Sequence, residues 1–473
     1  MGLLLSILLG LALVGVLIYI IAENQHPTQT LAWVVVIVFL PVIGLLLYFL
    51  VGHRPVQKQQ LSPEDKLQLQ QCVSETRARY TFTTSMLYQK VNTLQQQLGQ
   101  GVPLSGNAVR IYNRFYAMLA DMMNDMEQAR DHIHFEFFKF EDDAVGRQVA
   151  ELLKRKVREG VEVRVQYDDL ANLFRKKFFR ELKDAGVQVK PFLAVNFPFI
   201  SPDSNFRNHR KIVVVDGHVG YLGGMNIAER YGEGLDWGPW LDTHMRIEGP
   251  AVSQLQVAFV SDWRFSSRKL LSEPRYFPVS EAVGETSVQV VASSPMSSWH
   301  AAMQGLIQLL GDVNDYIYLQ TPYFIPTSSM MLALKNAALA GVDVRVMFPE
   351  RSDGLLTGLA SKSYVKEALS AGVRIFLYQG GFLHSKTIVC DDDFASVGST
   401  NLDVRSFTLD FEIDAYCYDP AVAAQQKAFF LKDMEKCVEV TAASWASRSR
   451  WEKFKESLAR LFSPLLYIKP GPF

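Results

Sequence analysis

One combination of histidine, lysine, aspartate and asparagine occurs twice in the chain, in the same direction. The two copies contain the same residue types at the same spacing: His209, Lys211, Asp216 and Asn226, then His384, Lys386, Asp391 and Asn401. Two histidines can act as a nucleophile and a proton donor, because an unperturbed imidazole titrates at about pH 6.5. Lysine ammonium groups and asparagine amides can neutralise phosphodiester oxygens while a covalent phosphohistidine forms. The repeat therefore indicates phosphodiester chemistry.

This combination resembles the HxKxxxxD signature of the phospholipase D superfamily. Longer blocks are similar to the bacterial cardiolipin synthases within it, and they cover residues 208–216, 223–226, 242–250, 321–324 and 398–406. The similarity extends over nearly the full length. It implies transfer of a phosphatidyl group between two phosphatidylglycerol molecules through a phosphohistidine, giving cardiolipin and glycerol. It also assigns His209 as the nucleophile and His384 as the general acid and later base, a choice that the symmetric sequence leaves open.

Other activities remain as alternatives. Hydrolysis of phospholipids, or headgroup exchange with a donor such as phosphatidylethanolamine, would use the same residues. A nucleic-acid partner is disfavoured, because 48 basic and 49 acidic residues give a net charge of -1 and leave no excess of cations. A non-catalytic scaffold is disfavoured because both copies of the signature are intact. We therefore predict a phosphatidyltransferase that acts on membrane phospholipids.

Four carboxylates accompany the two copies, and we expect two different roles for them. Asp216 and Asp391 fall where a strand should turn back, so we expect them to shape turns and support the catalytic geometry. Asp242 and Glu412 lie at equivalent places behind the signature histidines. They are the better candidates for orienting the imidazole rings, with solvated surface carboxylates as the alternative.

The two halves differ next to their asparagines, where Gly224 in the first half corresponds to Ser399 in the second. A hydrogen bond from Ser399 to phosphate would make the halves contribute unequally. We therefore group Ser399 with Asn226 and Asn401 as candidate phosphate ligands.

Metal ligands are not indicated. No cluster of Asp and Glu that could hold Mg²⁺ accompanies the signatures, and the four cysteines are far apart. His132 and His134 could share a strand face, but no third ligand is evident, so we expect buried or hydrogen-bonded histidines. We predict a reaction that needs no metal and no other cofactor.

Strand-forming segments recur in both halves of the chain, with helical segments between them. Residues 131–138, 160–165 and 185–189 correspond to residues 315–322, 341–346 and 371–375. This alternation predicts an α/β fold with central mixed, largely parallel sheets flanked by helices. Strongly β-prone residues follow each signature, so we expect its histidine and lysine to share one strand face. By its resemblance, the chain has two duplicated phospholipase D-like halves, at residues 103–270 and 271–440.

Two uncharged runs, at residues 2–22 and 31–52, open the chain. Each has about the length at which a helix crosses a membrane, and Pro41 in the second is tolerable there. The connector between the runs has no Lys or Arg, whereas Arg54 and Lys58 follow the second run. We therefore expect residues 1–53 to form two transmembrane helices that place the catalytic part on the cytoplasmic side of a bacterial inner membrane. A cleaved signal peptide is the alternative.

Two further segments flank the halves. Residues 54–102 are polar and rich in glutamine, and Ser62 before a proline predicts a helix start in this connector. Residues 441–473 contain an apolar helical stripe, including Trp451 and Phe454, beside several cations, which predicts contact with anionic lipid. Docking of this tail on the protein core is the alternative. Residues 174–180, which mix aromatics with cations, have the same two interpretations.

Overall fold

The computed structural model describes residues 2–22, 27–48, 61–83, 85–195, 205–297 and 299–462. Side chains in the first helix are described from Gly10 onward, apart from residue 12. The chain divides into two compact units, one formed by Met1–Lys58 with Val195–Asn205 and the other by Gln59–Ala194 with Phe206–Phe473.

The first unit contains helices α1 (Gly2–Ala22), α2 (Pro27–Phe39) and α3 (Pro41–Leu47). Within the second apolar run the helix is interrupted at Leu40, between α2 and α3. That residue leaves the helical region at φ -132° and ψ 68°, since the ring of Pro41 disfavours a helical residue before it. Among the described residues, no helix is both long and apolar enough to cross a membrane.

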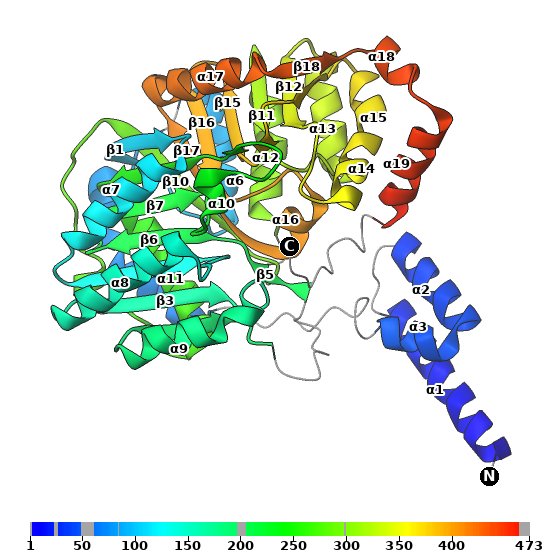
Figure 1. Cartoon of the computed structure of the whole chain (residues 1–473), viewed down its shortest axis with the longest axis horizontal. Coiled ribbons are helices and arrows are strands. Elements are labelled where there is room, and N and C mark those ends of the chain that lie inside the picture. The colour runs from blue at the N-terminus through cyan, green and yellow to red at the C-terminus, as the bar shows by residue number, and fades with distance from the viewer. Residues whose placement is uncertain are drawn as a thin grey trace. The chain divides into compact units, whose positions relative to one another are not determined.

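The second unit is built on one continuous mixed sheet covered by helices on both faces (Figure 1). Its first-half strands are β1 (Leu104–Tyr112), β2 (His132–Phe137), β3 (Glu162–Asp168), β4 (Gln188–Phe192), β5 (Arg207–Asn208), β6 (Lys211–Val215), β7 (Val219–Gly223), β8 (Trp240–Leu241) and β9 (His244–Glu248). Its second-half strands are β10 (Thr286–Ser293), β11 (Tyr316–Gln320), β12 (Asp343–Pro349), β13 (Arg374–Tyr378), β14 (Phe382–Leu383), β15 (Thr387–Cys390), β16 (Phe394–Gly398), β17 (Asp410–Tyr418) and β18 (Cys437–Val440).

The helices of this unit begin with α4 (Pro63–Cys72), α5 (Ser74–Tyr80) and α6 (Gln89–Gln97) of the connector. The first half adds α7 (Phe115–Glu127), α8 (Ala144–Arg158), α9 (Lys176–Asp184), α10 (Arg230–Glu233) and α11 (Val252–Ser267). The second half adds α12 (Ala301–Asp312), α13 (Ser328–Leu339), α14 (Leu355–Ser363), α15 (Val365–Leu369), α16 (Val404–Thr408), α17 (Pro420–Met434), α18 (Ala442–Ala446) and α19 (Arg450–Phe462).

The strand order in the main sheet is β18-β13-β12-β11-β15-β16-β17-β10-β1-β9-β7-β6-β2-β3-β4. Antiparallel pairing of β1 with β10 joins the two halves. Parallel pairs are confined to β2-β3-β4 and β11-β12-β13 in this order. The mixed α/β fold is confirmed, but the largely parallel sheet is wrong, because hairpins such as β6-β7 and β15-β16 pair antiparallel. The predicted strand segments are all present.

Each half packs apolar residues on both faces of its part of the sheet. Helices α7, α8 and α9 bury one face of the first half, and α11 buries the other. In the second half α12 to α15 cover one face and α17 the other. The two halves thus present their signature strands in matching layers.

Local signals decide several helix ends. Ser62 caps α4 as predicted, because its hydroxyl accepts a hydrogen bond from the Asp65 N–H while Pro63 occupies the first helical position. The sequence predicts that residues 174–180 either contact lipid or pack on the protein core. Phe178 and Phe179 of α9 are buried in the core, whereas Phe174 is 74% exposed.

The C-terminal helix α19 packs on the second half and also leaves an apolar face open. Ala459 is buried, and the Arg460 guanidinium lies 4.1 Å from the centre of the Tyr364 ring. Four apolar side chains of the predicted stripe remain exposed: Trp451, Phe454, Leu458 and Leu461. The helix therefore docks on the core through one face and exposes the other.

Two short strand pairs cross between the halves and position the signature histidines. Strand β5, directly before His209, pairs in parallel with β17 of the second half. Strand β14, directly before His384, pairs in parallel with β8 of the first half. Each histidine thus lies at the end of a two-residue strand, and not within the longer β6 or β15 where the sequence placed it.

Candidate active site

The ring of His209 is held by a carboxylate from the other half. Its Nδ1 lies 3.0 Å from both carboxylate oxygens of Glu412 on β17. The backbone N–H of His209 donates to the Phe411 carbonyl oxygen at 3.0 Å, which continues the pairing of β5 with β17. The ring also meets Phe138 edge to face, with centroids 5.0 Å apart. The Nε2 atom is left as the one available for chemistry.

His384 has the mirror arrangement. Its Nδ1 lies 2.7 Å from Asp242 Oδ2, immediately after β8 of the first half. The His384 N–H donates to the Leu241 carbonyl oxygen at 2.7 Å, as an extension of the β14-β8 pair. The sequence placed Asp242 and Glu412 behind the histidines of their own halves. The structure exchanges them, because β5 and β14 each cross to the opposite half.

The two signature lysines lie beside their histidines and are buried. Lys211 Nζ donates to the His209 carbonyl oxygen at 2.5 Å, and Lys386 Nζ donates to the His384 carbonyl oxygen. Lys386 Nζ is also 2.7 Å from His384 Nδ1 and 4.0 Å from Asp242 Oδ2. Lys386 is close enough to the first signature to lower the pKa of both Lys211 and His209. The two signatures therefore form one charged centre.

Burial governs the ionisation of this centre. It lowers the pKa of Lys211 to about 7 and that of Lys386 to about 8, despite the neighbouring carboxylates. Burial and then Lys211 hold the pKa of His209 well below its usual value, and burial with Lys386 lowers the pKa of His384 to about 4. These shifts favour the neutral form of both imidazoles at pH 7. An arriving phosphate anion would favour protonation of the surrounding bases.

The two orienting carboxylates differ in ionisation. Burial raises the pKa of Glu412 to about 7, although Lys211 and hydrogen bonds oppose the shift. Burial also acts on Asp242, but Lys386 and His384 outweigh it and the pKa of Asp242 lies below its ordinary value. The His384 ring therefore faces a firmly ionised carboxylate, which favours a positive charge on that ring more than on His209.

The candidate phosphate ligands are placed unequally. Asn226 is committed to its own loop, since its Oδ1 accepts the Lys139 N–H at 3.0 Å and its Nδ2 donates to Tyr231 at 2.5 Å. The Asn401 Oδ1 is buried and has no hydrogen-bond partner among the described residues. The Ser399 hydroxyl donates to Glu412 Oε2 at 2.5 Å and accepts the Ile413 N–H at 2.9 Å. Ser399 thus contacts the carboxylate that holds His209.

The signature aspartates lie at the far ends of β6 and β15 from the histidines. Asp216 accepts backbone N–H groups of Arg130, Asp131 and His132 at 2.8 to 2.9 Å. Asp391 does the same for residues 314–316 at 2.7 to 3.0 Å. Both have a positive φ, of 50° and 48°, which aspartate tolerates in turns. Through these hydrogen bonds each aspartate holds the start of β2 or β11, at a distance from the signature histidines.

His132 and His134 have hydrogen-bond partners within the protein. His132 Nδ1 lies 2.7 Å from Asp131 Oδ1, and His134 Nδ1 lies near the Gln256 amide. His134 also stacks on Phe259 with centroids 4.4 Å apart. In the part of the chain that the structure describes, no three His, Cys, Asp or Glu side chains are arranged to hold a metal ion.

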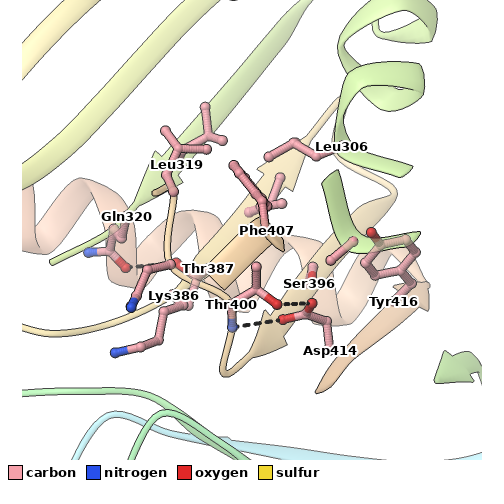
Figure 2. A pocket seen from close by; sticks show the side chains of 14 residues that line it. Leu306, Leu319, Gln320, Lys386, Thr387, Ser396, Thr400, Phe407, Asp414 and Tyr416 are labelled. Atoms are coloured by element: carbon pink, nitrogen blue, oxygen red, sulfur yellow. Dashed lines mark hydrogen bonds between the residues drawn. The ribbon is translucent and has the colours of Figure 1, made fainter. Parts of the chain in front are cut away.

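A small cavity of about 40 Å³ lies beside Lys386 in the second half (Figure 2). Leu306, Leu319 and Phe407 line its apolar side. Thr400 donates to Asp414 through its N–H at 3.3 Å and its hydroxyl at 2.5 Å, and Figure 2 shows the Lys386 ammonium pointing away from this pair. Burial raises the pKa of Asp414 to about 7. The cavity has room for a water molecule.

Sequence reasoning missed the aromatic surroundings of His384. Four rings lie with centroids 5.0 to 6.4 Å from its imidazole: Tyr231, Trp240, Tyr323 and Phe382. Alternation along a strand could have found two of them, because Phe382 and Trp240 lie two residues before His384 and Asp242. The other two come from a loop and a short helix that no local pattern places here.

Comparison with known proteins supports one family. The protein-family model described as "Cardiolipin synthase, PLD-like domain" matches residues 122–263 and 306–434. A second family model, "Phospholipase_D-nuclease N-terminal", matches residues 7–53. A cardiolipin synthase of Listeria welshimeri is 36% identical over 98% of this chain and 100% of its own length. A cardiolipin synthase of Staphylococcus aureus is 37% identical over 94% of this chain and 93% of its own.

A solved structure shares the fold. The phosphatidylserine synthase of Haemophilus influenzae superimposes with a TM-score of 0.59 over 80% of this chain and 98% of its own, at 14% identity. The cardiolipin synthase family model matches more than half of the chain, and the two relatives above are 36–37% identical over nearly all of it. The chain therefore belongs to the cardiolipin synthase family of the phospholipase D superfamily.

Proposed function

We propose that the protein makes cardiolipin from two phosphatidylglycerol molecules through a phosphohistidine on His209. The observation that carries this proposal is the pair of opposed histidines, each oriented through Nδ1 by a carboxylate of the other half. This arrangement leaves both Nε2 atoms for one phosphorus. Family membership supports cardiolipin as the product.

In the first step the neutral His209 Nε2 attacks the phosphorus of the donor lipid. The bond from phosphorus to the glycerol oxygen breaks, and His384 gives a proton to that oxygen, so glycerol leaves. Glu412 stabilises the charge that develops on the His209 ring. The low pKa of His209 supports its role as nucleophile, and the ionised Asp242 supports proton donation by His384 once phosphate is bound.

In the second step the neutral His384 removes a proton from the terminal hydroxyl of another phosphatidylglycerol. That oxygen attacks phosphorus, the bond to His209 breaks, and cardiolipin is released. Lys211 and Lys386 neutralise the phosphate oxygens in both steps, because a bound anion favours their protonated forms. These buried residues supply the positive charge without a metal.

We further propose that the enzyme works at the cytoplasmic face of a bacterial inner membrane, with its two apolar N-terminal runs as the anchor. The exposed apolar face of α19 supports this placement, since Trp451 and Leu461 are 65% and 74% exposed and cations of the same helix suit anionic lipid. Both substrates then lie in the membrane beside the centre.

Product analysis with labelled phosphatidylglycerol tests the reaction. We expect cardiolipin and free glycerol in equal amounts, and phosphatidic acid without cardiolipin would instead establish a hydrolase. If cardiolipin forms only when phosphatidylethanolamine is present, phosphatidylethanolamine is the donor of the phosphatidyl group.

A donor with a good leaving group tests the two histidine roles. With a phosphatidyl nitrophenol, His384→Ala should still release nitrophenol in a burst, because that leaving group needs no proton. His209→Ala should release none. A burst from His209→Ala and none from His384→Ala would reverse the assignment.

A further inference from the structure

The two signature histidines have unlike neighbours at equivalent places. Two residues before His209 lies Arg207, which is opposite Asp410 in the β5-β17 pair. Two residues before His384 lies Phe382, which is opposite Trp240 in the β14-β8 pair. The same backbone arrangement therefore carries a charged pair on one side of the centre and an aromatic pair on the other.

Arg207 is a buried cation near three carboxylates, Asp168, Asp169 and Asp410, and two of these also contact other groups. Only 8% of the Arg207 surface is exposed, and its Nη1 atom has no hydrogen-bond partner among the described residues. The two oxygens of Asp410 lie 3.0 and 3.1 Å from Arg405 Nε. The two oxygens of Asp168 accept the N–H groups of Ala171 and Asn208, each at 2.9 Å. An unused donor on a buried guanidinium is costly, and this cost indicates that a ligand with a hydrogen-bond acceptor, such as a phosphate oxygen, binds at Nη1.

Arg207 lies at a short distance from His209, and this distance limits how far the ligand can be from the reacting phosphorus. Arg207 and His209 lie on the same face, because residues alternate along the extended chain that pairs with β17. Two residues of extended chain span about 7 Å, which a glycerol bridge between two phosphates can cover. Asp410 and Arg405 are close enough to His209 to affect its pKa, so this cluster adjoins the nucleophile.

We propose that Arg207, beside the Arg405–Asp410 pair, binds the phosphate of the acceptor phosphatidylglycerol. The donor phosphate occupies Lys211 and Lys386, so a second anion needs its own cation at one glycerol's distance. Phe382, at the equivalent place beside His384, has no donor, although Trp240 Nε1 and Arg230 Nε on that side also lack hydrogen-bond partners among the described residues. This inference rests on the proposed function, and it names which substrate lies on which side of the centre.

The test compares two acceptors in the same full-length enzyme, in vesicles of phosphatidylglycerol. Cardiolipin formation uses an acceptor with a phosphate, whereas incorporation of labelled glycerol into phosphatidylglycerol uses an acceptor without one. Both reactions begin with the same capture of donor by His209. The ratio of the two rates therefore isolates binding of the acceptor phosphate.

We expect Arg207→Gln to lower cardiolipin formation about tenfold or more while glycerol incorporation stays near the wild-type rate. Arg207→Lys should lower the ratio less, since it keeps the charge but loses the fork of donors. Arg345→Gln is the matched control, because Arg345 pairs with Asp343 at 2.5 Å and contacts neither histidine. It should leave the ratio unchanged.

Several outcomes would overturn the proposal. If Arg207→Gln unfolds at the wild-type temperature but loses cardiolipin formation and glycerol incorporation equally, Arg207 would instead bind the donor lipid or support the structure of the active site. An unchanged ratio of the two rates in Arg207→Gln would refute the acceptor site at Arg207. If the glutamine variant does not fold, an unchanged ratio in Arg207→Lys would refute it. Glycerol incorporation without cardiolipin in the wild type would instead refute the proposed function, and this result is distinct from the others.

Discussion

Replacing Glu412 by glutamine should nearly abolish capture of the donor lipid by His209. The carboxylate at 3.0 Å from His209 Nδ1 keeps the proton on that nitrogen and leaves Nε2 as the nucleophile. Loss of a charged hydrogen-bond acceptor costs about 1.5–3 kcal/mol, which slows a reaction roughly 10- to 150-fold. A larger effect comes from the tautomer, because a comparable aspartate-to-asparagine change beside a catalytic histidine costs about 10⁴-fold.

Ser399 decides how the new amide is oriented. Its oxygen already accepts the Ile413 N–H, so its hydroxyl hydrogen points to position 412. The amide oxygen of Glu412→Gln then faces Ser399 and the NH₂ faces His209 Nδ1, which fixes the unreactive tautomer. We therefore expect a loss of about 10³- to 10⁴-fold. Ser399→Ala in the same protein frees the amide to turn and should restore about tenfold or more.

The assay follows the radiolabelled phosphatidyl group that stays on the protein after rapid mixing and alkaline quenching. Asp433→Asn serves as the control, since this half-buried carboxylate accepts a hydrogen bond from Gln320 at 2.8 Å and contacts neither signature histidine. Capture by folded Glu412→Gln within about tenfold of the wild type would refute the tautomer argument. Equal activity of the single variant and the variant with Ser399→Ala would refute the orientation.

The remaining predictions concern the other residues of the centre. Asp242→Asn should slow glycerol release about 100-fold or more and should be rescued by a nitrophenol donor; equal loss with both donors would contradict proton donation by His384. The value of kcat/KM should fall as pH rises from about 7 to 8, because Lys211 and Lys386 lose the protons with which they bind phosphate; a flat alkaline profile would contradict this. Asp216→Asn should lower the free energy of unfolding by about 1–3 kcal/mol, measured with denaturant, while the rate per folded molecule stays unchanged; normal stability with lost activity would show a catalytic role for Asp216. Activity should survive a chelator, and its restoration by one divalent ion after loss would show a metal requirement.

Much of the fold could be predicted because its signals are local. Apolar strand segments and the Ser62 helix start need only neighbouring residues, and the structure has them where expected. The proportion of parallel pairing could not be predicted, since a strand pattern does not say which strand lies next to it. The interruption at Leu40 shows a different limit, because one proline decides between a kinked helix and two separate ones.

The site shows the same division between local and long-range information. The signatures contain the histidines and lysines, and the structure gathers them in one centre. Their carboxylates lie 203 and 142 residues away along the chain from His209 and His384, respectively. Sequence could identify Glu412 and Asp242 by equivalence between the halves, but only the crossed strand pairs show which histidine each one holds.

The crossed carboxylates also explain why two nearly equivalent motifs can have different roles. Each half supplies a histidine to one arrangement and a carboxylate to the other, so neither half contains a complete acid, base or nucleophile. The difference must then arise from what surrounds each shared pair. Arg207 and Asp410 surround one histidine with charge, whereas Phe382 and Trp240 surround the other with aromatic rings. Exchange of Arg207 and Phe382 between their positions should therefore impair acceptor use without creating a second acceptor site, because Asp410 and Arg405 would remain beside His209.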